Sequence, residues 1–91
     1  MIKSRLGETI ARRLRDEKTE ILKELEAKEE CYTAIKLFCE EGEVLITLLM
    51  DEEQIENSVK EAVEEVFEGK AVIDIFISRS REIISFTIVK I

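Results

Sequence analysis

The chain has 91 residues, of which 45% are hydrophobic and 38% are charged, and its formal net charge is −7. A chain of this length builds one hydrophobic core, so residues 1–91 are expected to form a single domain. No apolar run is long enough to cross a bilayer, and the charged first residues do not resemble a signal peptide. These features exclude a disordered chain and predict a soluble, cytoplasmic protein.

Residues that carry chemistry are scarce. There is no His, and the two cysteines, Cys31 and Cys39, are too few for a structural zinc site. On one extended strand they would stand about 26 Å apart, so we interpret them as buried thiols; the alternatives are an intersubunit disulfide and a site shared between chains. The sequence contains no Gly-rich phosphate loop and no nucleophile elbow. We therefore predict no cofactor, no resident metal and no enzymatic activity.

The first predicted element is a helix from about Ser4 to Ala27, because its apolar residues recur at helical spacing. Gly7 weakens the first turns. The apolar stripe lapses midway, which allows a break between Asp16 and Thr19. The stripe consists of Leu6, Ile10, Leu14, Ile21 and Leu25.

Two strands are predicted next. The first covers Cys31–Glu40, where Ile35 and Leu37 share one face and the intervening residues share the other. A tight turn at Gly42 follows. The second strand, Val44–Met50, is apolar on both faces apart from one threonine, which is typical of a central strand.

The clearest local signal is a helix start. Asp51 is a good N-cap, Gln54 completes a capping box three residues later, and Met50 and Ile55 are placed as a hydrophobic staple. Gly69 stands where a helix commonly ends with a left-handed residue. The helix is expected to begin at Glu52, and its buried stripe is expected to be Ile55, Val59, Ala62, Val63, Val66 and Phe67.

Two further strands are predicted, Ala71–Ile77 and Glu82–Ile91, joined by a turn through residues 78–81. The order α-β-β-α-β-β predicts an α+β fold of two layers, with both helices on one face of an antiparallel sheet. The other face is then bare, so we expect a homodimer that completes or covers the sheet. The last strand is expected to be an edge, which also allows a swapped or intertwined dimer. Among the residues expected on the bare face are Val72, Phe76, Ile83, Val89 and Ile91.

Charge is spread unevenly along the chain. Residues 1–28 carry eight basic and six acidic side chains, residues 29–70 three and thirteen, and residues 71–91 three and two, so the segments contribute +2, −10 and +1. We predict that the acidic middle docks a basic protein partner. The alternatives are a solvated face that maintains solubility and a weak Ca²⁺ or Mg²⁺ site. The predicted docking residues are Glu52, Glu53, Glu56, Glu61, Glu64, Glu65 and Glu68.

A nucleic-acid-binding module is the alternative function from another class. Its phosphate contacts would come from arginines in the first helix and at the second hairpin. Against it, the chain is acidic overall, with a pI of about 4.7, and few aromatic side chains are available for stacking on bases. The arginines concerned are Arg12, Arg13, Arg15, Arg79 and Arg81.

The small acidic chain, the α-β-β-α-β-β order and the doubly apolar strand resemble small archaeal orphan proteins of unknown function that form intertwined α+β homodimers. This resemblance rests on overall character and on no motif, and it implies a dimer and an archaeal source. One asparagine, Asn57, and one glutamine, Gln54, beside many charged residues are also typical of hyperthermophile proteins. We therefore expect a thermophilic source.

Overall fold

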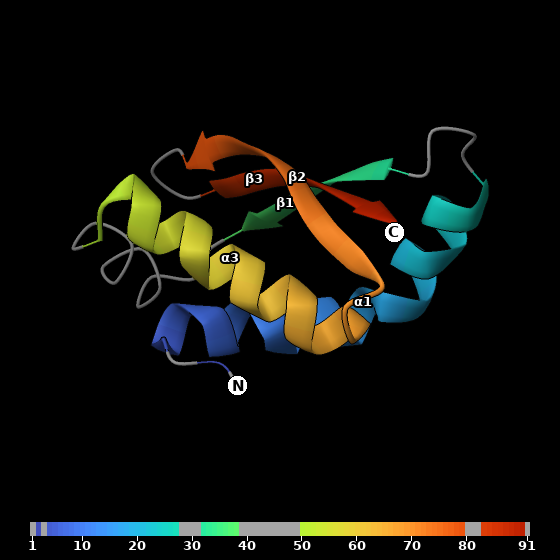
Figure 1. Cartoon of the computed structure of the whole chain (residues 1–91), viewed down its shortest axis with the longest axis horizontal. Coiled ribbons are helices and arrows are strands. Elements are labelled where there is room, and N and C mark those ends of the chain that lie inside the picture. The colour runs from blue at the N-terminus through green and yellow to red at the C-terminus, as the bar shows by residue number, and fades with distance from the viewer. Residues whose placement is uncertain (1, 3, 28–31, 39–49, 80–82, 91) are drawn as a thin grey trace.

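The computed structural model describes residues 2, 4–27, 32–38, 50–79 and 83–90. In this part of the chain it is an α+β fold in which two helices pack on a three-stranded antiparallel sheet (Figure 1). No helix there is both long and apolar enough to cross a membrane. The elements in chain order are α1 (Arg5–Ala27), β1 (Tyr32–Phe38), α3 (Glu52–Phe67), β2 (Ala71–Arg79) and β3 (Ile83–Lys90).

Several predictions fall on residues outside the described ones. These are both cysteines, the turn at Gly42, all but the last residue of the strand expected over Val44–Met50, Arg81 and Ile91. The second strand and the full α-β-β-α-β-β order therefore stay predictions, and the described elements follow the order α-β-α-β-β.

Helix α1 begins after Ser4, which caps it. The Ser4 hydroxyl accepts a hydrogen bond from the Gly7 backbone N–H at 2.9 Å, and the Ser4 carbonyl accepts one from Glu8 N–H at 3.1 Å. The predicted bounds and buried stripe are confirmed, but the break between Asp16 and Thr19 does not occur. Glu17 and Lys18 are strong helix formers, so the helix continues through this turn although the turn has no apolar residue facing the core. The second half of α1 bends away from the line of the first (Figure 1).

Helix α3 starts as predicted. The Asp51 carboxylate accepts a hydrogen bond from Gln54 N–H at 2.8 Å, and the Gln54 side-chain oxygen accepts one from Asp51 N–H at 3.0 Å. Met50 packs against the core that includes Ile55, in keeping with the predicted staple. The whole predicted stripe is buried, together with Ser58.

The strand order in the sheet is β1-β3-β2, with antiparallel pairing on both sides of β3. The prediction that the last strand is an edge is therefore wrong. β3 pairs with β1 from Tyr32 opposite Val89 to Phe38 opposite Ile83. A hairpin of β2 and β3 alone would leave the other edge of β3 unpaired, and β1 occupies that edge. Among the described strands, β1 and β2 form the two edges.

Strand β2 is longer and less regular than predicted. Ser78 and Arg79 pair with Ser85 and Ile84 of β3, so they extend the strand instead of forming a turn. Two register shifts interrupt the pairing, one after Ile73 and one after Phe76. Bulges of this kind break the alternation of a strand. As a result Val72 pairs with Val89 and Phe76 with Phe86, so four positions along β2 correspond to three along β3. The side chain of Phe76 lies outside the described part of the structure, so its expected place on the bare face stays a prediction.

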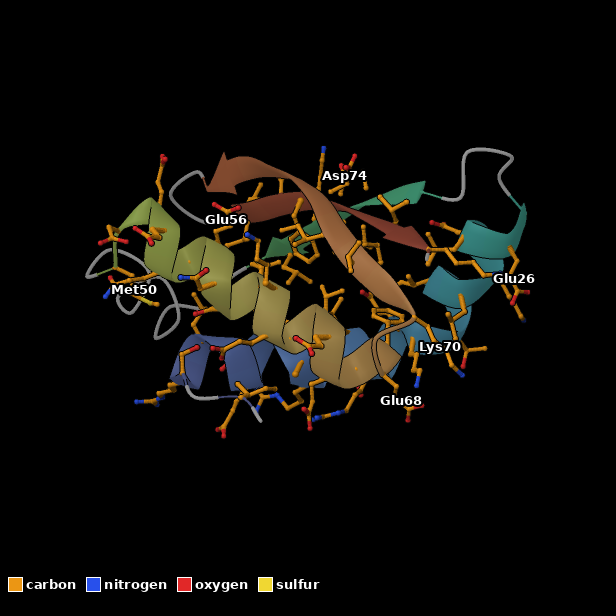
Figure 2. All side chains as sticks on the ribbon, in the orientation of Figure 1. Glu26, Met50, Glu56, Glu68, Lys70 and Asp74 are labelled. Carbon is orange, nitrogen blue, oxygen red and sulfur yellow. The ribbon has the colours of Figure 1, made fainter. Side chains whose placement is uncertain are left out.

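The hydrophobic core lies between the helices and one face of the sheet (Figure 2). Strand β1 follows the predicted alternation, with Ile35 and Leu37 buried and Ala34 and Lys36 exposed. On the other face, Val72 is 46% exposed, and Ile83 and Val89 are half-buried. Neither described helix covers this second face, as expected for a two-layer fold.

Candidate functional site on the exposed face of helix α3

The exposed face of α3 is strongly acidic. Outside its buried stripe the helix carries six glutamates and one lysine. That lysine, Lys60, pairs with Glu56 at 3.2 Å, and both side chains remain about half exposed. Such a surface pair contributes about 0.3–0.5 kcal/mol and neutralises one carboxylate within the helix. Most of the charge on this face is therefore not balanced by residues of α3 itself.

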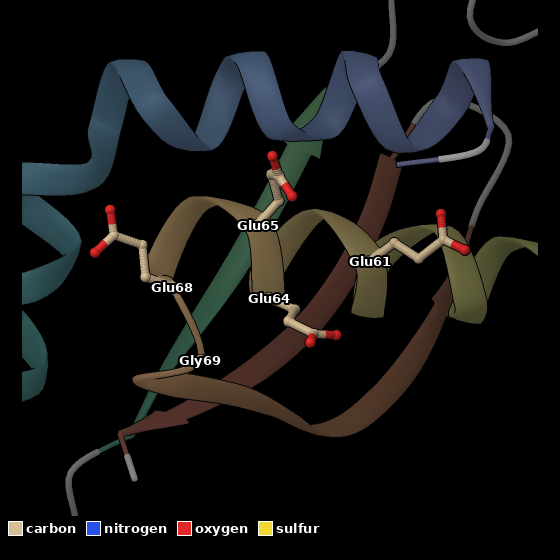
Figure 3. A pocket seen from close by; sticks show the side chains of 5 residues that line it. All are labelled: Glu61, Glu64, Glu65, Glu68 and Gly69. Atoms are coloured by element: carbon tan, nitrogen blue, oxygen red, sulfur yellow. The ribbon is translucent and has the colours of Figure 1, made fainter. Parts of the chain in front are cut away.

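The predicted docking residues divide into two groups. Glu52, Glu53 and Glu56 lie in the first half of the helix. The other four surround one open hollow of about 520 Å³, together with Gly69, and we call this the acidic hollow (Figure 3). Its carboxylates belong to Glu61, Glu64, Glu65 and Glu68.

The four carboxylates of the acidic hollow do not point the same way. Glu65 reaches toward α1, Glu64 points to the opposite side of the helix, and Glu68 stands at its C-terminal end (Figure 3). Glu61 and Glu65 have interaction partners within the chain. The hollow is thus lined by carboxylates on different sides of the last turns of α3, and two of them already interact with other groups of the chain.

The end of α3 has an unusual backbone. Gly69 is left-handed with φ 77°, as predicted, but Glu68 before it is also left-handed with φ 54° and ψ 38°. That conformation costs a residue with a side chain about 1–2 kcal/mol. The last turn contains no basic side chain, although the negative end of a helix favours cations. A glutamate at position 68 therefore lowers the local stability of the helix end. Residues that cost stability in this way are common at functional sites.

No family model, curated protein or solved structure matches this chain. The function is therefore argued from the geometry and charge of the described residues. Among these residues, no group of three or more His, Cys, Asp or Glu side chains is arranged to hold a metal ion. The described carboxylates of the acidic hollow can therefore attract a charged ligand, but they are not arranged as the ligands of a metal ion.

The arginines of the nucleic-acid alternative are not gathered into one described surface. Arg12 and Arg15 are exposed on α1, and the half-buried Arg13 has an interaction partner within the chain. Arg79 ends β2, in the sheet layer, and Arg81 lies outside the described residues. The described structure therefore gives this alternative no assembled phosphate-binding face.

Sequence reasoning missed a second hollow next to the first. It is lined by Lys60 and Glu64 of α3, by Gly69 and by residues 71–73 of β2. The spacing of Lys60 and Glu64, one turn apart on the exposed face, was the available signal. Nothing local indicated that β2 would run alongside that turn.

Proposed function

We propose that this protein is a non-enzymatic docking module that binds a basic segment of a partner protein on the exposed face of α3. The observation that carries the proposal is the acidic hollow, an open hollow whose lining consists of Gly69 and four glutamates from the last turns of α3 and its C-cap. The partner segment is expected to insert lysine or arginine side chains there.

The chemistry of the acidic hollow suits cationic side chains. Glutamates three or four positions apart on a helix are neighbours, about 5–6 Å between Cβ atoms, so two carboxylates can contact one guanidinium. Arginine binds carboxylates through paired hydrogen bonds, which adds geometric selectivity to charge. The negative end of the helix dipole at Gly69 acts in the same direction. The surrounding acidic segment would speed the approach of a basic partner at low salt.

The left-handed Glu68 favours this function over a face that only maintains solubility. Solubility needs net charge, which any exposed position supplies equally well. Solubility does not require a glutamate at position 68. In the left-handed conformation a glycine would give a more stable protein, and the C-terminal end of a helix disfavours a negative charge. The proposal gives the carboxylate at position 68 a role.

We also propose that the functional unit is a homodimer. The support is the second face of the described sheet, which neither described helix covers, and the exposure of Val72 on it. Soluble proteins most often cover such apolar surface with a second copy related by a two-fold axis.

Reversing the charge at position 68 tests the docking site. With a labelled peptide of alternating arginine and serine as probe, Glu68→Lys is expected to weaken binding about tenfold at low salt, because it replaces an attraction by a repulsion. The matched control is Glu26→Lys, an exposed glutamate at the C-terminal end of α1, with the same charge change at the same kind of helix end. It should alter binding by less than about twofold. Equal weakening in both variants would mean that net charge, and no particular site, holds the peptide.

Replacing Glu68 by glycine should separate binding from stability. Glu68→Gly removes one carboxylate and relieves the left-handed backbone, so the free energy of unfolding is expected to rise by about 0.5–1 kcal/mol. The same variant should bind the peptide more weakly. Urea unfolding and a peptide titration measure the two effects, and a more stable variant with unchanged binding would remove Glu68 from the site.

A further inference from the structure

The second hollow lies where α3 meets the start of β2. It is open, measures about 470 Å³ and is lined by Lys60, Glu64, Gly69 and residues 71–73; we call it the β2 edge groove. Val72 within it is the exposed large hydrophobic side chain of the described residues. Among the described strands β2 pairs only with β3, so no described strand occupies its other edge, and an edge of this kind can accept a further strand.

Only the first stretch of this edge is regular. Residues 71–73 pair in register with β3, and the first of two register shifts follows directly after Ile73. Bulges protect an edge against added strands. A strand that joins β2 is therefore confined to residues 71–73, with Val72 at the centre of the contact.

The β2 edge groove holds a cationic side chain next to a carboxylate, in a chain that is acidic overall. Lys60 and Glu64 are both exposed and lie about 6 Å apart along the axis of α3. Lys60 is also held by Glu56 at 3.2 Å, a surface pair too weak to remove it from other contacts. Two chains of net charge −7 repel each other as whole molecules, and the acidic exposed face of α3 repels its own copy most strongly. A groove with one cation and one anion is where two copies can meet.

We propose that a second copy of this chain binds in the β2 edge groove. About a two-fold axis near Val72, the two β2 strands run antiparallel, and the sheet continues through both copies. The α3 helices then lie antiparallel on the same side of the joined sheet. Lys60 faces Glu64 of the partner subunit, and Glu64 faces the partner's Lys60, so one charge pair forms twice.

This inference rests on the homodimer proposed as the functional unit, and it does not depend on the basic partner. It replaces an exchange of the last strand, since β3 is central and paired on both sides. Glu64 lines the acidic hollow as well as the groove. Pairing at β2 therefore sets the acidic hollows of the two copies on the same face of the dimer.

Reciprocal charge reversal tests the surface, with mass measured by light scattering in reductant. The native chain is expected to be a dimer. Lys60→Glu and Glu64→Lys each place like charges opposite each other, so each should raise the dimer dissociation constant at least about tenfold. Mixed in equal amounts, the two variants should dimerise again, because each then faces the opposite charge. Effects confined to one chain cannot produce that recovery.

Two controls carry the same charge changes elsewhere. Lys23→Glu and Glu26→Lys alter exposed positions on α1 and should leave the dimer intact. A chain with both Lys60→Glu and Glu64→Lys should also dimerise, since the pairs are restored with reversed polarity.

Three results would overturn the proposal. A native chain that is monomeric would remove the homodimer itself. A dimer that persists in both single variants would place the interface on another surface. Variants that stay monomeric after mixing would show that the reciprocal pairs do not form. Binding of the arginine and serine peptide is measured separately, so the docking proposal stands or falls on its own titration.

Discussion

Replacement of Phe86 by alanine is expected to lower the free energy of unfolding by about 3–5 kcal/mol. Phe86 is fully buried and lies in the central strand β3, where it pairs with Ile35 of β1 and Phe76 of β2. Strands on both sides and helices over the core face hold the walls of this position, so the cavity cannot collapse. The total free energy of unfolding of a native protein is about 5–15 kcal/mol. The variant should therefore lose a large share of its stability.

Urea unfolding followed by circular dichroism measures this loss, at one fixed protein concentration because dimerisation adds stability. Ile88→Val is the matched control, two residues along β3 and also fully buried. It deletes one methyl group and should cost about 0.5–1.5 kcal/mol. If Phe86→Ala cost no more than this control, β3 would not form the centre of the core.

Replacement of Gly7 by alanine is expected to lower the free energy of unfolding by about 1 kcal/mol, against the usual trend. Gly-to-Ala changes inside a helix normally stabilise by about 1 kcal/mol. Here an added Cβ would lie 2.8 Å from Ile2 Cγ2, 2.9 Å from Ser4 Oγ and 3.4 Å from the Ser58 carbonyl oxygen. Overpacking of this kind costs about 1–3 kcal/mol.

The contacts of Ser4 explain why the crowding is not easily relieved. Its hydroxyl accepts a hydrogen bond from the Gly7 N–H at 2.9 Å and is hydrogen-bonded to the Ser58 hydroxyl at 2.8 Å. Ser58 is 2% exposed and also donates to the Gln54 carbonyl at 2.9 Å. If Ser4 moved aside, the N-cap of α1 would be lost, at about 1 kcal/mol, along with a contact between the two helices.

Thermal or urea unfolding of Gly7→Ala decides the sign. Asn57→Ala, at an exposed position of α3, serves as the comparison and should gain a few tenths of a kcal/mol from helix propensity alone. A gain of similar size at Gly7 would show that the Ile2 and Ser4 side chains yield readily and that α1 packs loosely on α3 there.

The candidate site was predictable in composition but not in shape. The sequence located every glutamate of the acidic hollow on one helix and anticipated a left-handed Gly69, because helix periodicity and C-terminal capping are local rules. It did not indicate that Glu68 is left-handed too. It also did not separate Glu65, which reaches toward α1, from Glu64, which points to the opposite side, since that division depends on the neighbours of α3.

Local signals in the sequence determined the individual elements. The capping box at Asp51 set the start of α3, the alternation around Ile35 identified the core face of β1, and helical spacing defined both buried stripes. Each of these signals acts between residues a few positions apart, where backbone hydrogen bonding and side-chain direction follow directly from residue type.

The tertiary structure alone decided how the elements meet. The apolar side chains of β3 would be buried equally well at an edge or in the centre of the sheet, and only its pairing with β1, about fifty positions earlier in the chain, made it central. The bulges in β2 likewise belong to the fit between two strands. The approach of Lys60 and Glu64 to β2 arises from packing between two consecutive elements, and the close approach at Gly7 from packing between α1 and α3. No local sequence pattern encodes either contact.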